Sequence, residues 1–215
     1  MMVAARNGAW AKSGSPTPAA YGGLRFTAES DNSTVQLTAV GSAPAVTLVK
    51  SFDGVNWEDY TVGEVIELPS IGDFVYLAAG EGGNETFASS TSIYNRFVIN
   101  GLVAASGDIT SLRRFDLIQT PIVDYCYYSM FQDCTGLTSA PELPATTLAN
   151  HCYSNMFQGC TGLALIKVHF TAWGSQTSSW VSNVASAGTF YKPSALPEEF
   201  SANRIPTGWT VVNID

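Results

Sequence analysis

The stretch Cys126-Tyr-Tyr-Ser-Met-Phe-Gln-Asp-Cys-Thr-Gly-Leu137 recurs as Cys152-Tyr-Ser-Asn-Met-Phe-Gln-Gly-Cys-Thr-Gly-Leu163, with an offset of 26 residues. A fixed offset between near-identical stretches is typical of an architecture in which one structural unit repeats along the chain. If successive units stack, equivalent side chains lie above one another. We therefore expect five stacked pairs, which are Cys126 on Cys152, Met130 on Met156, Phe131 on Phe157, Cys134 on Cys160 and Leu137 on Leu163.

The length of the unit and its fixed leucines indicate a short solenoid of the leucine-rich-repeat type. A degenerate earlier copy begins at Gly107-Asp-Ile-Thr-Ser-Leu112, and Leu165-Ile-Lys-Val-His-Phe170 is predicted to be a strand. The predicted repeats are about 107–125, 126–151 and 152–170, followed by a C-terminal cap over 171–215. Together they form the second predicted domain, residues 106–215.

The segment before the repeats shows the alternation of apolar and polar residues that is typical of half-buried strands. Leu24, Phe26 and Ala28 alternate with polar residues, and Asp53-Gly54 is a hairpin signal because both residues tolerate positive φ. Six or seven short strands at this spacing predict a β-sandwich of immunoglobulin type over 24–105. The predicted fold class is therefore mainly β, with a sandwich followed by a short solenoid.

Residues 1–23 are rich in Ala, Gly, Ser and Pro and are predicted to be a flexible leader. Trp10 is the candidate anchor that would attach this leader to a larger assembly. The leader has no apolar run long enough for a signal peptide or a membrane span. Export would then need a signal outside this sequence or another path, such as assembly into a virus particle.

Composition excludes several classes of function. The chain of 215 residues is 46% hydrophobic and carries a formal net charge of −8 with a pI near 4.6, so nucleic acid is not an expected partner. The two histidines, His151 and His169, lie in no nucleophile or metal motif, and no phosphate-binding loop is present. Nothing in the sequence places carboxylates such as Glu142, Glu198 and Glu199 across a cleft. We expect no enzyme activity and no cofactor.

The four cysteines match no zinc-binding spacing. The repeat favours buried free thiols at equivalent positions. Neighbouring rungs of a solenoid are separated by roughly 5 Å, which is close to the spacing of a disulfide, so stacked disulfides stay open as an alternative.

The repeat unit resembles that of the BspA-like leucine-rich repeat proteins of gut Bacteroidales and their phages. The resemblance covers about residues 24–215, including Ser51-Phe-Asp-Gly-Val-Asn-Trp-Glu-Asp-Tyr60 in the preceding β-domain and Ile205-Pro-Thr-Gly-Trp-Thr-Val-Val212 in the cap. Relatives usually carry many repeats, whereas this chain has two good copies. The resemblance implies adhesion to a host protein or glycan.

Aromatic side chains are the candidate ligand-binding residues, because flat rings contribute contact area at little entropic cost. The candidates are Tyr125, Tyr128, Trp173 and Trp180. Tyr127 and Tyr153 are expected to form a further buried pair, whereas Tyr128 has Ser154 as its counterpart and is expected to be exposed. His151, between the repeats, is expected to be a solvated loop residue.

Two functions are compatible with these features. The first is a structural and adhesion protein of a phage virion, such as a fibre or decoration protein. The alternative is a bacterial cell-surface adhesin. Both place the chain on a virion or an extracellular surface, with protein assemblies and surface glycans as partners. A solenoid of two good turns buries little surface alone, which favours a homo-oligomer.

Overall fold

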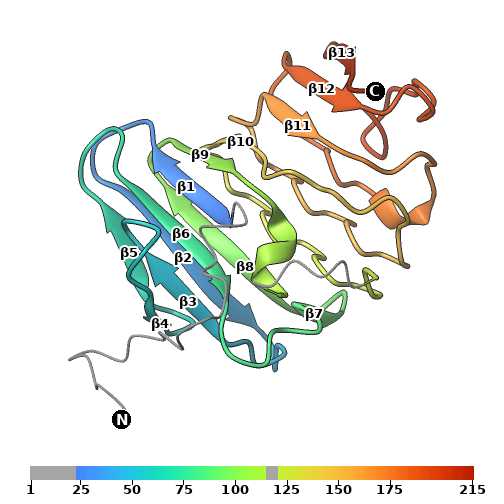
Figure 1. Cartoon of the computed structure of the whole chain (residues 1–215). Coiled ribbons are helices and arrows are strands. Elements are labelled where there is room, and N and C mark those ends of the chain that lie inside the picture. Colours follow the sequence, from blue (N-terminus) through green and yellow to red (C-terminus); the bar gives the residue numbers. More distant parts are fainter. Residues whose placement is uncertain (1–22, 115–120) are drawn as a thin grey trace.

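The computed structural model describes residues 23–114 and 121–215, and these form a mainly β structure with two sheets (Figure 1). Predicted features of residues 1–22, Trp10 included, lie outside the described part. A nine-stranded sheet has the order β13-β12-β11-β10-β9-β1-β6-β3-β4, and a four-stranded sheet has the order β5-β2-β8-β7. The strands are β1 (Leu24–Ala28), β2 (Ser33–Val40), β3 (Leu48–Ser51), β4 (Glu58–Tyr60), β5 (Val65–Leu68), β6 (Phe74–Ala79), β7 (Ala88–Ser90), β8 (Ile93–Asn100), β9 (Val103–Ser106), β10 (Leu137–Ser139), β11 (Leu165–Lys167), β12 (Thr189–Lys192) and β13 (Thr210–Asn213). Helical structure in the described residues is limited to 3₁₀ turns at Ile109–Leu112 and Ser175–Thr177.

The alternating pattern of the N-terminal half produces strands with one buried face. In β1 the side chains of Leu24, Phe26 and Ala28 are buried, and the intervening residues are partly exposed. The hairpin between β3 and β4 turns at Asp53, whose carboxylate accepts backbone N–H bonds from Val55 at 2.8 Å and Asn56 at 2.7 Å. The bonds from Asn56 and Val55 hold the pKa of Asp53 well below its ordinary value.

The two sheets meet through aromatic side chains. The ring of Phe26, on β1 of the long sheet, lies 5.0 Å from that of Phe97 on β8 of the short sheet, in an edge-on arrangement. Each sheet thus buries its inward face against the other, which is how a stack of two sheets encloses one core. The described elements are therefore compatible with a sandwich in this half.

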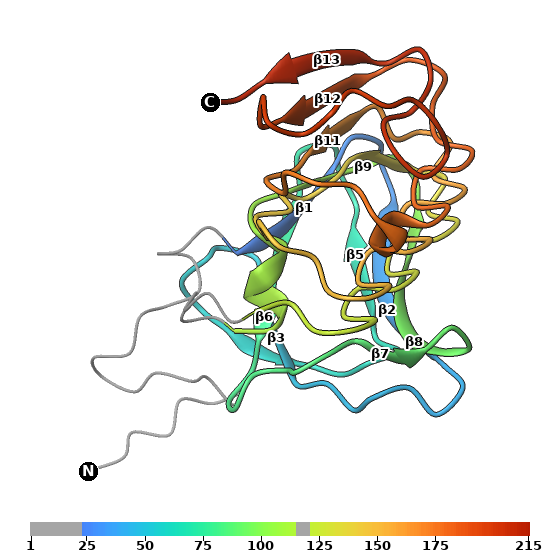
Figure 2. The ribbon, with the colours of Figure 1, turned by 90° about the vertical axis from the view of Figure 1, so that its right-hand side faces the viewer.

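The long sheet continues without a break into the repeat region. Strand β9 pairs antiparallel with β1 on one side and parallel with β10 on the other. From β10 to β13 all neighbours are parallel, and these strands lie in succession in Figure 1; Figure 2 shows β11, β12 and β13 from the side. The predicted boundary between residues 105 and 106 thus falls inside a strand that both halves share.

The two copies of the repeated stretch lie directly against each other. Odd-numbered residues from Tyr127 to Asp133 donate their backbone N–H to the second copy, as in the bond of 2.9 Å from Phe131 to the Met156 carbonyl. Even-numbered residues donate to the carbonyl three residues earlier, as Met130 does to Tyr127. The stretch is thus a chain of tight turns in which every second amide is free to bond the next layer.

A third layer follows the second, although the sequence indicated only a cap there. The N–H groups of Tyr153, Asn155 and Phe157 donate to carbonyls of Gln176, Ser178 and Trp180. The spacing has shortened from 26 to 24 residues, and this change conceals the third layer from a search at fixed offset. Its outer side is closed by the segment around Asn203, because the Val181 N–H donates to the Ala202 carbonyl.

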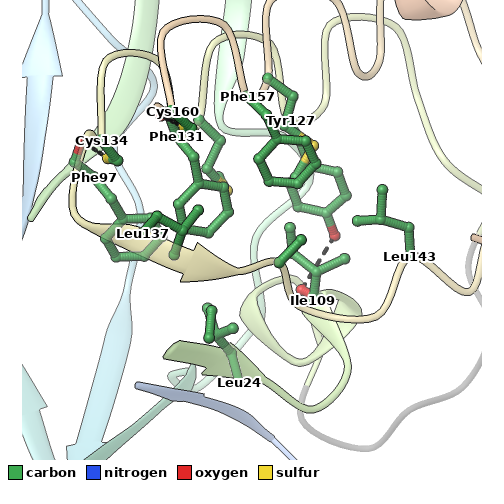
Figure 3. Close-up of a cluster of buried hydrophobic side chains, with 14 of the residues drawn as sticks. Leu24, Phe97, Ile109, Tyr127, Phe131, Cys134, Leu137, Leu143, Phe157 and Cys160 are labelled. Carbon is green, nitrogen blue, oxygen red and sulfur yellow. Dashed lines mark hydrogen bonds between the residues drawn. The ribbon is translucent and has the colours of Figure 1, made fainter. Parts of the chain in front are cut away.

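Aromatic stacks run through these layers and begin in or next to the short sheet, at Phe97 and Phe87. Phe131 stacks on Phe97 with ring centroids 5.1 Å apart and on Phe157 at 5.7 Å. A second stack joins Tyr127 to Phe87 at 6.1 Å and to Tyr153 at 6.0 Å. The side chains from both halves form one buried cluster, part of which is shown in Figure 3.

The four cysteines are buried free thiols. The thiol of Cys134 donates to the carbonyl of Phe97 at 3.2 Å, and that of Cys160 donates to the carbonyl of Phe131 at 2.9 Å. Phe97 and Phe131 occupy equivalent places in successive layers, so the same bond recurs one layer on. Burial raises the pKa of Cys126, Cys134 and Cys152 to about 12.

Glycines allow the layers to approach closely. A Cβ atom on Gly136 would lie 1.8 Å from the carbonyl oxygen of Gly101, and one on Gly162 would lie 2.7 Å from that of Thr135. The same holds at Gly188, where a Cβ would lie 2.5 Å from the oxygen of Ala164. The glycine of the Cys-Thr-Gly-Leu motif is therefore required by packing of backbone on backbone.

Candidate ligand-binding surface on the turns

Four aromatic side chains form a row across the turns and onto the short sheet. The ring of Tyr94, on β8, lies edge-on to Tyr128 at 5.5 Å, and Tyr128 lies edge-on to Tyr125 at 6.0 Å. Tyr125 in turn stacks on His151 at 5.1 Å. Tyr94, Tyr125 and His151 are partly exposed, so the row presents ring surface to solvent. We call these four residues the aromatic row.

Two candidates predicted from the sequence are buried. Tyr128 was expected to be exposed, but its exposed fraction is 7%, because Tyr94 and Tyr125 pack against its ring and Asn155 donates to its hydroxyl at 2.8 Å. Trp180 has no exposed surface and donates its indole N–H to the Arg204 carbonyl at 2.8 Å. The exposure expected for Tyr128 is therefore wrong, and Trp180 is part of the core.

An open hollow continues the row beyond His151. Its volume is ≈ 320 Å³, and it is lined by His151, Gly174, Ser175, Ser178, Asn203 and Arg204. Trp173, the fourth candidate, stands next to this lining, because the guanidinium of Arg204 lies 5.5 Å from the centre of its ring. Tyr125 and Trp173 are therefore each in contact with a residue that lines the hollow.

Three polar side chains that line the hollow are held in place by hydrogen bonds to neighbouring residues. The imidazole Nδ1 of His151 lies 3.1 Å from the hydroxyl of Ser154. The side-chain oxygen of Asn203 accepts the Ser179 N–H at 2.7 Å. Arg204 donates through Nε to Glu199 at 3.3 Å and through Nη1 to the Gly174 carbonyl at 3.1 Å. Such anchoring fixes a side chain before a ligand arrives.

A cluster of charged side chains lies elsewhere, beside the bridge between Asp108 and Glu142. Glu142 bonds Lys167 at 2.8 Å and His169 at 2.6 Å. Desolvation alone would raise the pKa of Glu142, but the bonds to Lys167 and His169 outweigh it and leave that pKa below its ordinary value. Burial raises the pKa of Asp108. The carboxylate also accepts a hydrogen bond from the Thr110 N–H, which lowers that pKa but does not outweigh burial. Because these charged groups bond to one another and to Thr110, we interpret the cluster as a structural ion-pair network.

No group of three metal-ligating side chains is present in residues 23–114 and 121–215. The same residues contain no helix with the length and hydropathy needed to cross a bilayer. The hollow and the aromatic row together offer ring area, hydroxyl groups, an amide and a guanidinium group as binding groups.

One signal for this surface is present in the sequence but lies outside the quoted motif. His151 follows Tyr125 by 26 residues, the offset of the repeat, and the two rings stack as a further equivalent pair. His151 is therefore a partly exposed member of the row, whereas a solvated loop residue was expected. Asn203 and Arg204 reach the hollow from the C-terminal segment through tertiary packing, which no local pattern predicts.

Comparisons with protein-family models, with curated proteins and with solved structures give no match. The resemblance to BspA-like leucine-rich repeat proteins rests on the quoted motifs and stays a prediction.

Proposed function

We propose that this chain is a non-enzymatic structural and adhesion protein that displays a binding surface, and that it is a component of a phage virion such as a fibre or decoration protein. In this proposal residues 24–105 are an immunoglobulin-like sandwich and residues 106–215 a short leucine-rich-repeat solenoid with its cap. A bacterial surface adhesin that binds host protein or glycan is the alternative.

One observation supports the display of a ligand-binding surface. The residues of the aromatic row lie on elements that backbone hydrogen bonds join to one another. Tyr94 belongs to the short sheet, Tyr125 and Tyr128 to the first layer of turns, and His151 to the second. Backbone bonds between these elements, such as that from Phe97 to the Met130 carbonyl at 2.7 Å, hold the rings at fixed spacing. A surface on such a scaffold binds without first having to be ordered.

Assembly into a particle is tested through the leader. A variant lacking residues 1–23, and a Trp10→Ala variant, are produced during infection together with the remaining phage proteins, and purified particles are probed for the chain. The proposal predicts loss of the chain from particles with its fold retained by circular dichroism. Unchanged incorporation of both variants would contradict the virion proposal.

The adhesin alternative is tested by binding of the purified protein to cells. Tyr125→Ala removes exposed ring area from the aromatic row, and Tyr191→Ala is the matched control because Tyr191 is a partly exposed tyrosine on β12, outside the row. The binding surface proposed here predicts that only Tyr125→Ala weakens attachment to bacterial or host cells. Equal attachment of both variants would show that the aromatic row does not contribute to binding.

A further inference from the structure

We infer that the hollow beside the aromatic row binds a neutral oligosaccharide, with one sugar in the hollow and the chain continuing over His151 and Tyr125. This inference rests on the proposed function, since it names the ligand class of the binding surface. It is carried by the lining of the hollow, by the anchoring of its polar side chains and by its charge.

The side chains that line the hollow carry polar groups, except at Gly174. The six residues around the hollow include no aliphatic side chain, and Ser175, Ser178 and Asn203 are exposed. A peptide anchor such as leucine would find no aliphatic side chain to pack against there. A ligand rich in hydroxyl groups can instead exchange hydrogen bonds with serine, amide and imidazole groups.

Donors are already oriented toward the hollow by the bonds on their other atoms. With its oxygen engaged by Ser179, Asn203 retains the NH₂ group as a donor. With Nδ1 engaged by Ser154, His151 retains Nε2. With Nε and Nη1 engaged, Arg204 retains Nη2, and its plane is supported by the Trp173 ring. These three side chains thus supply one donor or acceptor each.

Charge favours a neutral sugar over an acidic one. Arg204 is the cation of the hollow, and Glu199 already pairs with it at 3.3 Å. The whole chain carries a formal net charge of −8. A uronic or sialic acid would therefore meet a compensated cation within a negative protein, whereas a neutral sugar meets no electrostatic penalty.

The adjoining rings supply the second part of the site. The His151 ring lines the hollow and stacks on Tyr125, so a ligand that leaves the hollow on this side meets the exposed edge of the aromatic row. Sugar rings have apolar C–H faces that pack on aromatic surfaces, and their hydroxyl groups remain available for bonding at the rim. An oligosaccharide uses both features, whereas a monosaccharide uses only one.

The test measures binding of neutral oligosaccharides, namely gluco-, galacto- and manno-oligosaccharides, and of sialylated and uronic acid oligosaccharides, by titration calorimetry and saturation-transfer NMR. Ser178→Trp fills the hollow from an exposed position, and Ser42→Trp is its control, because Ser42 is an exposed serine in the N-terminal half. Asn203→Asp keeps the oxygen that accepts from Ser179 and removes the NH₂ donor.

The expected result is binding of at least one neutral oligosaccharide with saturation transfer to its ring protons. Ser178→Trp should weaken it at least tenfold, Asn203→Asp by about tenfold, the equivalent of about 1.4 kcal/mol, and Ser42→Trp not at all. No binding of any neutral oligosaccharide at about 10 mM, tighter binding of the acidic ones, or undiminished binding by Ser178→Trp would overturn the inference. If Ser178→Trp still attaches to cells while oligosaccharide binding is absent from every variant, the inference fails and the proposed function stands.

Discussion

At the scale of single residues, stacked rings pack successive layers against one another. Phe131 has no exposed surface and lies between Phe97 and Phe157, one from the short sheet and one from the next layer. Its ring therefore joins three separate elements through a single side chain. Removing a ring at this position leaves a cavity that the rigid neighbours cannot fill.

Phe131→Ala should lower the free energy of unfolding by about 3–5 kcal/mol, the usual range for a fully buried phenylalanine. Urea denaturation followed by circular dichroism measures this loss. Gln132→Ala, at the adjacent and partly exposed position, is the control and should change stability by less than about 0.5 kcal/mol. Similar losses in the two variants would show that Phe131 is not between the layers.

The buried thiols make stability depend on pH in the alkaline range. Burial raises the pKa of Cys126, Cys134 and Cys152 from 9.0 to about 12, so the unfolded chain loses these protons first. Their contribution is complete below pH 9 and is lost as the pH rises toward 12, at about 1.4 kcal/mol per pH unit for each thiol. Urea denaturation at about pH 8 and about pH 10.5 should show this fall.

Cys134→Ala provides the comparison for the alkaline series. It should make the fall with pH shallower by about 1.4 kcal/mol per pH unit, because one of the buried groups no longer titrates. A pH dependence identical to that of the parent chain would mean that Cys134 is exposed to solvent.

At the scale of elements, the close approach of the layers depends on glycine. The N–H of Gly162 donates to the Thr135 carbonyl at 3.1 Å, and a Cβ at this residue would lie 2.7 Å from that same oxygen. The neighbour is backbone, so it cannot swing aside as the end of a flexible side chain could. The layers themselves would have to separate.

Gly162→Ala should therefore cost about 2–3 kcal/mol of unfolding free energy, as overpacking against a fixed neighbour does. Gly63→Ala serves as the control. Gly63 has a φ of +96°, but a Cβ added there would meet no atom within 4 Å, so the variant has conformational strain of about 1 kcal/mol without a clash. Thermal or urea denaturation ranks the two variants. A smaller loss at Gly162 than at Gly63 would argue against contact between the layers.

Sequence patterns predicted elements better than they predicted the candidate site. Alternation located β1, the Asp53-Gly54 turn signal located the β3–β4 hairpin, and the repeat identified which side chains occur at equivalent positions. Burial of Tyr128 depends on Tyr94, a residue far away in the chain, and the hollow requires Asn203 from the C-terminal segment. Contacts of this kind are set by tertiary packing, which leaves no periodic trace in a single sequence.

At the scale of the whole molecule, the long sheet and the aromatic stacks connect both halves. Strand β9 bonds to the N-terminal half through β1 and to the repeats through β10. The ring stacks begin at Phe97 in the short sheet and at Phe87, the residue before β7. The first layer of the repeat thus rests on a preformed surface of the N-terminal half. A short stack of repeated units is stabilised when a different structure covers its end.

The two near-identical stretches are adjacent layers, and an engineered cysteine pair tests this arrangement most directly. Gln132 and Gln158 face each other, with Nε2 and Oε1 3.4 Å apart, whereas Ser182 lies in the third layer at the corresponding place. The four native thiols are buried and leave the engineered pair to react. Adjacent layers are roughly 5 Å apart and alternate layers roughly 10 Å, beyond the reach of a disulfide.

Mass spectrometry after mild oxidation of the folded protein measures the outcome. Stacked layers predict a disulfide in the Gln132→Cys/Gln158→Cys variant and none in the Gln132→Cys/Ser182→Cys variant. No disulfide in the first pair, or equal yields in both, would contradict the stacking.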